Sequence, residues 1–410
     1  MLEVIAALAA FTLIIVMVRL GKDLGLAIFA GSLALLVLLT PASIPSTLVA
    51  TLLNTRTVYL IVISFAIALF AEVYEVTGLV NEMGLGLARA LRSPLLAVML
   101  VPAIVALLPV AGGALMSAPM ISGVGKAAGL SAGEMVFANV WFRHIVFLSY
   151  PLNQVMIITS AMTGVNVITL AGVQAPILCF SALIGYLLVR KRHLSNGLES
   201  VSRASIPLRY SLSPLVIAVL LALTLRYIMG PFGMPVGVAL AIPLAIMASW
   251  RLRKRDLGST LLKALRGRRV WTITFTAYAI MLLQHSMVST GASSALAKLL
   301  SLVPAPTEVL YVMVPAVIAV LTGSTLSGVV LSIPMLPPLP NAVVAASLVY
   351  VSALTAYIGS PTHLCLIYTT KYFGEGSMKS SYKYLLVSIF STLLFAYLYL
   401  TLVVQRFLLG

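Results

Sequence analysis

Charged residues are scarce in this sequence, and their scarcity sets the class of protein. They make up 9% of its 410 residues, whereas hydrophobic residues make up 61% and the mean hydropathy is +1.11. Because a soluble domain carries about a quarter charged residues, the composition predicts a polytopic membrane protein. No polar stretch exceeds about 20 residues, which is too short for a soluble domain with a core of its own.

Cysteine and buried acidic residues are also nearly absent. The two cysteines, Cys179 and Cys365, lie in apolar segments, which predicts packing roles rather than disulfide or CxxC metal chemistry. No aspartate lies in an apolar run, since Asp23 and Asp256 both fall in loops. This absence disfavours a cation/proton exchanger built on paired aspartates. The apolar runs also lack DDxxD, HExxH and GxGD motifs, so we predict neither an enzyme nor a cofactor.

Apolar runs of about 17–25 residues or longer predict an all-α fold with five membrane spans in each half of the chain. The predicted spans are Leu2–Val18, Leu24–Leu39, Val58–Val73, Ala132–Met162, Val167–Val189, Leu212–Ile228, Pro235–Trp250, Val270–Val288, Ala342–Tyr372 and Tyr384–Phe407. Amphipathic pieces at 78–92 and 291–303 precede two further apolar segments.

Those two further segments are too short to cross a bilayer. Residues 95–108 would form a helix of about 21 Å, against a hydrocarbon core of about 30 Å, and residues 308–321 are equally short. Glycine, serine and proline follow each segment, which predicts re-entrant hairpins at 94–128 and 307–340. Irregular backbone in a membrane is tolerated only against protein or a water-filled cavity, so paired breaks indicate the binding site of a transporter.

Each hairpin is followed by a long helix with an internal proline. Pro151 interrupts the predicted helix 132–162, and Pro361 interrupts the predicted helix 342–372. A simple proline kink would explain either residue alone. Because both helices follow hairpins, we favour broken helices, whose free N–H groups suit an anion and whose carbonyl groups suit Na⁺.

The distribution of basic residues predicts the orientation in the membrane. With the loops 190–192 and 251–269 in the cytoplasm, nearly all of the 26 Lys and Arg residues lie inside. The exceptions are Arg56, Arg226, Lys298 and Arg406 outside and Arg143 within a span. This bias explains the net charge of +16 without nucleic acid. It also makes the halves inverted-topology repeats, 1–192 and 210–410, both termini outside, joined by a basic linker at 193–209.

An arginine within a span is costly and indicates function. Three roles remain open for Arg143: it binds an anionic solute, it neutralises Glu72 or Glu75, or it extends to the cytoplasmic interface. Histidines within spans are more often packing residues than proton carriers. His363 is the exception that we favour, because it follows the break at Pro361.

Neutral oxygen and amide groups near the breaks complete the predicted site, without any metal except Na⁺. The predicted solute-binding residues are Gly112, Gly113, Ser117, Asn139, Arg143, Asn153, Ser324, Thr325, Thr362 and His363. The predicted coupling-ion residues are Pro109, Ala111, Tyr150, Thr322, Gly323, Ser327 and Ser360.

Three segments carry a family resemblance: Leu108-Pro109-Val110-Ala111-Gly112-Gly113 with Ser117-Ala118-Pro119, Asn139-Val140-Trp141-Phe142-Arg143-His144-Ile145, and Tyr150-Pro151-Leu152. They resemble domain-of-unknown-function family 401, uncharacterised prokaryotic membrane proteins that look like a branch of the ion transporter superfamily, with its gluconate permeases, divalent-anion/sodium symporters and citrate carriers. The resemblance implies a homodimer in the plasma membrane, with a scaffold domain and an elevator-like transport domain carrying organic anions with Na⁺ or H⁺. The Ser-Asn-Thr triplet of the sodium/dicarboxylate pattern is missing from both hairpin tips.

Two transport hypotheses therefore stand beside the disfavoured one of a membrane-embedded enzyme. The first is a secondary active transporter of a small anionic solute, coupled to Na⁺ or H⁺, with hairpin tips and broken-helix ends around the solute. The second is a cation/proton exchanger of the same architecture with His363 as the proton carrier.

Overall fold

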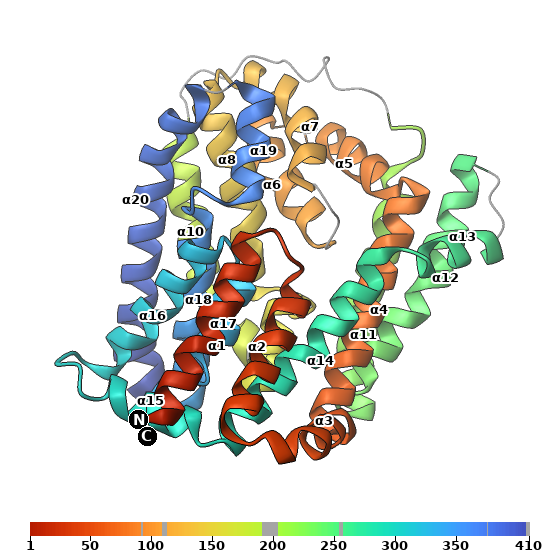
Figure 1. Cartoon of the computed structure of the whole chain (residues 1–410). Coiled ribbons are helices and arrows are strands. Elements are labelled where there is room, and N and C mark those ends of the chain that lie inside the picture. The colour runs from red at the N-terminus through yellow and green to blue at the C-terminus, as the bar shows by residue number, and fades with distance from the viewer. Residues whose placement is uncertain (92, 109–112, 191–203, 254–256, 375, 407–410) are drawn as a thin grey trace.

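The computed structural model describes residues 1–91, 93–108, 113–190, 204–253, 257–374 and 376–406, and these residues form helices joined by short connections (Figure 1). The helices of the first half are α1 (Leu2–Arg19), α2 (Leu24–Leu39), η1 (Pro41–Ser43), α3 (Ile44–Leu53), α4 (Thr55–Thr77), α5 (Leu79–Ala90), α6 (Pro94–Ala106), α7 (Gly113–Ala127), α8 (Ala132–Ile145), η2 (Val146–Ser149), α9 (Gln154–Thr163) and α10 (Val167–Val189).

The second half repeats this order of long and short helices. Its helices are α11 (Leu208–Met229), α12 (Gly233–Arg253), α13 (Leu257–Leu265), α14 (Arg268–Ser289), α15 (Ala292–Leu300), α16 (Thr307–Thr322), α17 (Thr325–Ser332), α18 (Ala342–Ile358), α19 (Leu364–Phe373), α20 (Gly376–Leu398) and η4 (Tyr399–Val404). The packing of the helices is repeated as well. The contact of α6 with α7 corresponds to that of α16 with α17, and the contact of α2 with α14 corresponds to that of α12 with α4.

Side-chain caps explain where several of these helices begin. Asp23, Asn54, Asn153 and Asn341 each accept hydrogen bonds from backbone N–H groups in the first turn of α2, α4, α9 and α18. The capping box expected from the spacing of Ser131 and Glu134 is confirmed at the start of α8. These caps satisfy N–H groups that would otherwise be unpaired in an apolar environment.

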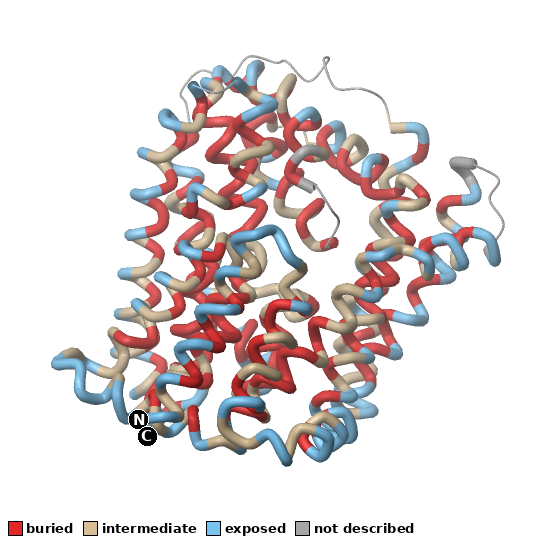
Figure 2. The backbone as a smooth tube through the Cα atoms, in the orientation of Figure 1, coloured by how far each residue is buried: buried red, intermediate tan, exposed pale blue. Residues whose placement is uncertain are grey.

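Seven helical segments are long and apolar enough to cross a membrane, judged by length and composition over the described residues. Three of the ten expected spans are not among them: α2, with 16 residues, and α18, with 17, are short, and α14 has 22 residues but is less apolar. The outward side of α20 exposes Val387, Phe390 and Leu394 by 50–67% (Figure 2). Apolar side chains in such a row suit lipid, so the protein is a multi-pass membrane protein.

Two short helices were missed from the sequence. The prediction of a plain loop at 251–269 is wrong, because α13 occupies Leu257–Leu265, and α3 at Ile44–Leu53 was likewise not predicted. Both are shorter than a membrane span, and apolar residues at helical spacing are their only signal.

The helices form two groups that combine both halves of the chain. We name α1–α4 with α11–α14 bundle A, and α6–α10 with α16–α20 bundle B. In bundle A, α4 packs on α12 and α14. In bundle B, α8 and α10 pack on α20. A polar contact between the bundles is the hydrogen bond from Gln284 Nε2 to the carbonyl oxygen of Met162, at 2.8 Å.

The amphipathic helices α5 and α15 connect bundle A to bundle B. α5 follows α4 and packs on α6 and on α11, and α15 follows α14 and packs on α1. They lie at opposite ends of the molecule in Figure 1. The predicted amphipathic pieces are thus helical at both connections.

Candidate functional site

The site is a cavity of about 280 Å³ inside bundle B, where segments of both halves meet. It lies between the break of the first half, where Asn153 to Val155 begin α9, and the hairpin tip of the second half, where Gly323 to Leu326 join α16 to α17. His144 of α8, Phe147 of η2 and three residues of α18 complete the wall. Of the predicted solute-binding residues, Asn153, Ser324 and Thr325 line this cavity together.

Two helices begin at the cavity. The side chain of Asn153 accepts hydrogen bonds from Val155 N and Met156 N at 3.0 and 3.1 Å, so it caps α9. The side chain of Ser324 accepts from Ser327 N at 3.2 Å and caps α17. Both caps are neutral. The positive ends of both helix dipoles therefore face the cavity without a carboxylate to neutralise them.

The opposite wall is one face of α18. Tyr350, Leu354 and Tyr357 lie four and three residues apart and line the cavity together. Tyr350 Oη donates to the carbonyl oxygen of Phe147 at 2.8 Å and lies 3.3 Å from Asn153 Oδ1. This bond ties the helix of the second half to the break of the first half.

Beside the cavity, the break of the second half gathers three oxygen atoms. Ser360 Oγ donates to the carbonyl oxygen of Val320 at 2.8 Å and lies 2.9 Å from Thr362 Oγ1. Gly323 fits against Thr362 with φ of +63°, and a Cβ atom there would lie 2.5 Å from Thr362 Oγ1. Neutral oxygens on unwound backbone are the ligands that Na⁺ sites in transporters use.

Arg143 is buried near the cavity without lining it. Its side chain is 5% exposed, and its Nη1 has no hydrogen-bond partner. Glu75 is instead bound to Arg269, at 2.6 Å, and Arg143 forms no ion pair within the described residues. The open alternatives of neutralising Glu72 or Glu75 and of extending to the cytoplasmic interface therefore find no support among the described residues. Arg143 interacts electrostatically with His144 and Tyr357, which do line the cavity.

Around Tyr150, the break of the first half is apolar. Tyr150 lines a pocket of about 10 Å³ with Leu107, Leu108 and Leu152 among others. The described residues around this pocket form no oxygen cluster comparable to that of Ser360, Thr362 and the Val320 carbonyl group in the second half. The predicted residues Pro109, Ala111 and Gly112 lie outside the described residues, and Gly113 is the first residue of α7.

Four further predicted residues lie away from the cavity wall. Ser117 Oγ donates to Asn139 Oδ1 at 2.7 Å, and Asn139 Nδ2 donates to Thr369 Oγ1 at 2.9 Å, so these groups join α7, α8 and α19. Thr322 Oγ1 bonds back to the carbonyl oxygen of Ile318, at 2.7 Å. Ser327 is buried in α17. Roles of these residues in binding stay predictions.

A second cavity, of about 330 Å³, lies where α4 and α11 of bundle A meet α9 of bundle B. Arg56 and Arg226 both line it, and neither forms an ion pair with a described residue. They are two of the basic residues that the predicted orientation places outside.

Sequence reasoning missed Gln154, Tyr350 and Tyr357 and interpreted His144 as a packing residue. Spacing contained a signal for the tyrosines, since they are seven residues apart and so share a face of α18. Nothing in the sequence showed that this face meets the start of α9, because that contact joins the two halves.

Comparisons with known proteins agree with a membrane protein fold. The sequence profile of the family described as "Protein of unknown function (DUF401)" matches residues 3–404. The structure is similar to the crystal structure of the YdaH transporter of Alcanivorax borkumensis, with a TM-score of 0.65 over 88% of this chain and 89% of that one. At 13% identity this likeness shows a shared fold alone. No curated protein matches the sequence.

Proposed function

This chain belongs to the family of proteins of unknown function DUF401, so its function has to be inferred from its site. We propose that it is a secondary active transporter of a small organic anion. The observation that carries the proposal is the convergence of two helix N-termini, one from each half, on one cavity of about 280 Å³. N–H groups that the caps leave unpaired at such ends bind carboxylate or phosphate oxygens. The fold shared with a transporter supports the proposal.

Arg143 supplies positive charge near the bound anion. No aspartate or glutamate is among the described residues that line the cavity, and Arg143 keeps an unpartnered Nη1. A buried guanidinium without a carboxylate is costly, so a solute that partly neutralises it gains affinity.

The coupling ion in this proposal is Na⁺, held by Ser360, Thr362 and the carbonyl oxygen of Val320. The support is the 2.8–2.9 Å cluster of these oxygens beside Gly323, which lines the cavity. A cation bound there attracts the anion in the cavity and is itself held more tightly, which couples the two gradients.

We further propose inverted-topology repeats with an elevator-type movement of bundle B along bundle A. Inverted repeats are supported by three observations. The order of helices is repeated, the packing of α2 on α14 is matched by that of α12 on α4, and α5 and α15 lie at opposite ends. A cavity held wholly within bundle B supports movement of that bundle as the carrier. Membership of the ion transporter superfamily and a homodimer remain predictions from the resemblance.

Asn153→Asp tests the anion site. A carboxylate accepts the same two N–H bonds and preserves the cap, but it adds a negative charge where the solute anion would bind. The measurement is the melting temperature of purified protein with acetate, succinate, citrate or gluconate, each with and without Na⁺. A ligand at 100 times its Kd stabilises the native protein by about 2.7 kcal/mol.

We expect at least one of these anions to raise the melting temperature of the natural sequence and none to raise that of Asn153→Asp. Asn54→Asp is the matched control, because Asn54 caps α4 in the same way and does not line the cavity. Equal stabilisation of Asn153→Asp and the control would remove the helix ends from the binding mechanism.

A cation/proton exchanger is the second candidate, favoured by one observation. The ring centroids of His144 and His363 lie 4.6 Å apart in the interior of bundle B. A pH jump across proteoliposomes separates the candidates, since exchange of Na⁺ for H⁺ without any organic solute would favour the exchanger.

A further inference from the structure

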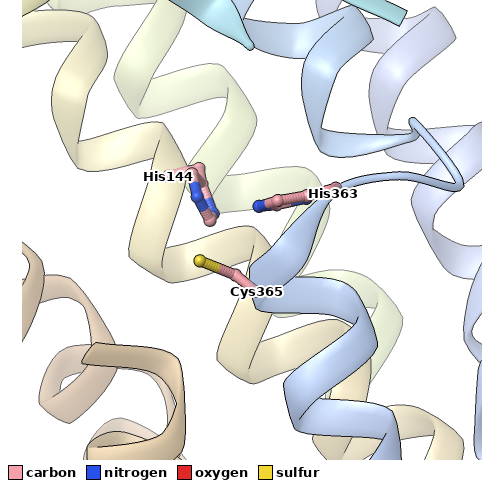
Figure 3. Close-up of side chains that lie close together, drawn as sticks. All are labelled: His144, His363 and Cys365. Carbon is pink, nitrogen blue, oxygen red and sulfur yellow. The ribbon is translucent and has the colours of Figure 1, made fainter. Parts of the chain in front are cut away.

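Three side chains in bundle B point toward one another, and only one of them, His144, also lines the anion cavity. They are His144 of α8, His363 at the start of α19 and Cys365 in its first turn (Figure 3). Their ligand atoms all lie within 4.8 Å of one another. The cluster joins residues 219 and 221 positions apart in the chain, so packing of the two halves creates it.

Both imidazole rings are oriented by the backbone. His144 Nδ1 lies 2.6 Å from the carbonyl oxygen of Val140, and His363 Nδ1 lies 3.2 Å from that of Ile358. Because a carbonyl oxygen only accepts, each Nδ1 carries the proton and each Nε2 keeps its lone pair. Metal-binding histidines in proteins show this arrangement, in which a backbone carbonyl fixes the tautomer and the ring.

His363 has a ligand atom that nothing in the protein uses. The residue is fully buried, and its Nε2 has no hydrogen-bond partner. A buried nitrogen lone pair without a donor is costly, and a bound ion would satisfy it.

Cys365 supplies the third donor, and Arg143 sits beside it. The guanidinium of Arg143 lies close enough to the Cys365 side chain to interact with it electrostatically. Its positive charge would balance a thiolate there. Two neutral imidazoles, one thiolate and one guanidinium carry no net charge together.

This charge balance selects the ion. A monovalent ion leaves one net charge in the protein interior and a divalent ion leaves two, which costs more at low dielectric. Thiolate and imidazole together suit copper among the soft metals, whereas Zn²⁺ in structural sites takes four ligands. We propose that His144, His363 and Cys365 bind a monovalent soft d¹⁰ cation, Cu⁺ or its analogue Ag⁺.

Binding would require small movements and the loss of one proton. Three donors around an ion at about 2.0–2.3 Å lie about 3.5–3.7 Å apart, so side-chain rotations must close the cluster by about 1 Å. The ion replaces the proton on the Cys365 sulfur. That proton leaves to water through the cavity that His144 lines, and the oxidation state of the ion does not change. The site does not depend on the proposed transport of an anion.

The experiment is competition for Cu⁺ between the purified, tag-free protein and a chromogenic Cu⁺ chelator under anaerobic conditions. We expect one Cu⁺ per chain and release of one proton per ion. Cys365→Ser and His363→Ala should each weaken binding at least tenfold. Cys179→Ser and His285→Ala are the matched controls: Cys179 lies exposed on α10, and His285 lies 3.1 Å from Thr51 Oγ1, in bundle A.

X-ray absorption of the Ag⁺-loaded natural protein provides a readout that needs no variant. Two nitrogen neighbours and one sulfur neighbour are expected. A coordination shell without sulfur, no binding under competition, or equal losses in the Cys179 and Cys365 variants would each overturn the site. Tighter binding of Zn²⁺ than of Cu⁺ would overturn the charge argument and with it the proposed ion.

Discussion

The two broken helices share an outline and differ in chemistry. Counted back from their prolines, Asn139, Arg143 and His144 of α8 correspond to Val349, Ala353 and Leu354 of α18. At these three pairs of positions, the polar and charged side chains thus belong to the first half only.

The breaks themselves show the opposite division. Tyr150 and Leu152 of the first half correspond to Ser360 and Thr362 of the second, and only the second pair gathers oxygen atoms. Each half therefore supplies what the other lacks. The helix order is repeated, but the site that we propose combines the charge of one half with the hydroxyl groups of the other.

Arg143→Met is the strongest test of this division. Loss of a buried charge partner costs about 2–5 kcal/mol, so affinity for the anion should fall about 30-fold or more. Stability without solute should hold or rise, because the variant removes a buried charge that has no carboxylate partner. Melting temperatures with and without the stabilising anion measure both effects, and a large loss of stability with unchanged affinity would make Arg143 structural.

Ser360→Ala and Thr362→Val test the oxygen cluster against Tyr150→Phe in the other half. Loss of one ligand oxygen, about 1.4 kcal/mol, should raise the Na⁺ concentration for half-maximal uptake about tenfold. Tyr150→Phe should leave it unchanged, because its surroundings are apolar. The measurement is uptake of the stabilising anion into proteoliposomes at graded Na⁺ concentrations. Equal effects of the variants in both halves would contradict a coupling-ion site in the second half alone.

Gly323→Ala tests how tightly the hairpin tip fits the second break. A left-handed conformation costs an alanine about 1–2 kcal/mol, and here the new Cβ atom also meets Thr362 Oγ1. Gly164→Ala is the control, with φ of +76° and no neighbouring atom nearer than 3.8 Å. Both variants should melt earlier, but only Gly323→Ala should lose several-fold in uptake rate at matched protein amounts. Uptake lost equally in both would contradict the tip contact.

Arg56→Gln and Arg226→Gln should have the smallest effects. These residues line the cavity between the bundles, so they attract the anion toward the protein without holding it in bundle B. Uptake at low salt should fall two- to fivefold, and the difference should vanish at high salt. Lys298→Gln, on α15, is the control, and a loss that persists at high salt would assign the arginines a different role.

Much of the frame was predictable because its signals are local. Prolines 151 and 361 mark the places where the helices end, and the capping box at Ser131 marks the start of α8. Length and hydropathy set the spans, although α2 and α18 are shorter than a full crossing. Short helices such as α13 were missed, since nine residues give too little periodicity to separate from a loop.

The site was less predictable because its contacts join distant residues. Asn153 and Ser324 were expected at the cavity from their place at the breaks. The neighbours of Arg143 were not, since Cys365 lies in the other half of the chain. Ser117 and Asn139 satisfy each other, a pairing that a sequence pattern does not reveal.

The two connecting helices also have a mechanical consequence. As rigid levers, α5, with 12 residues, and α15, with nine, measure about 18 and 14 Å. Levers of unequal length that swing through the same angle cover unequal strokes. If both helices swing through the same angle as they carry bundle B past bundle A, the path of bundle B combines a slide with a tilt, and the end held by α15 travels less.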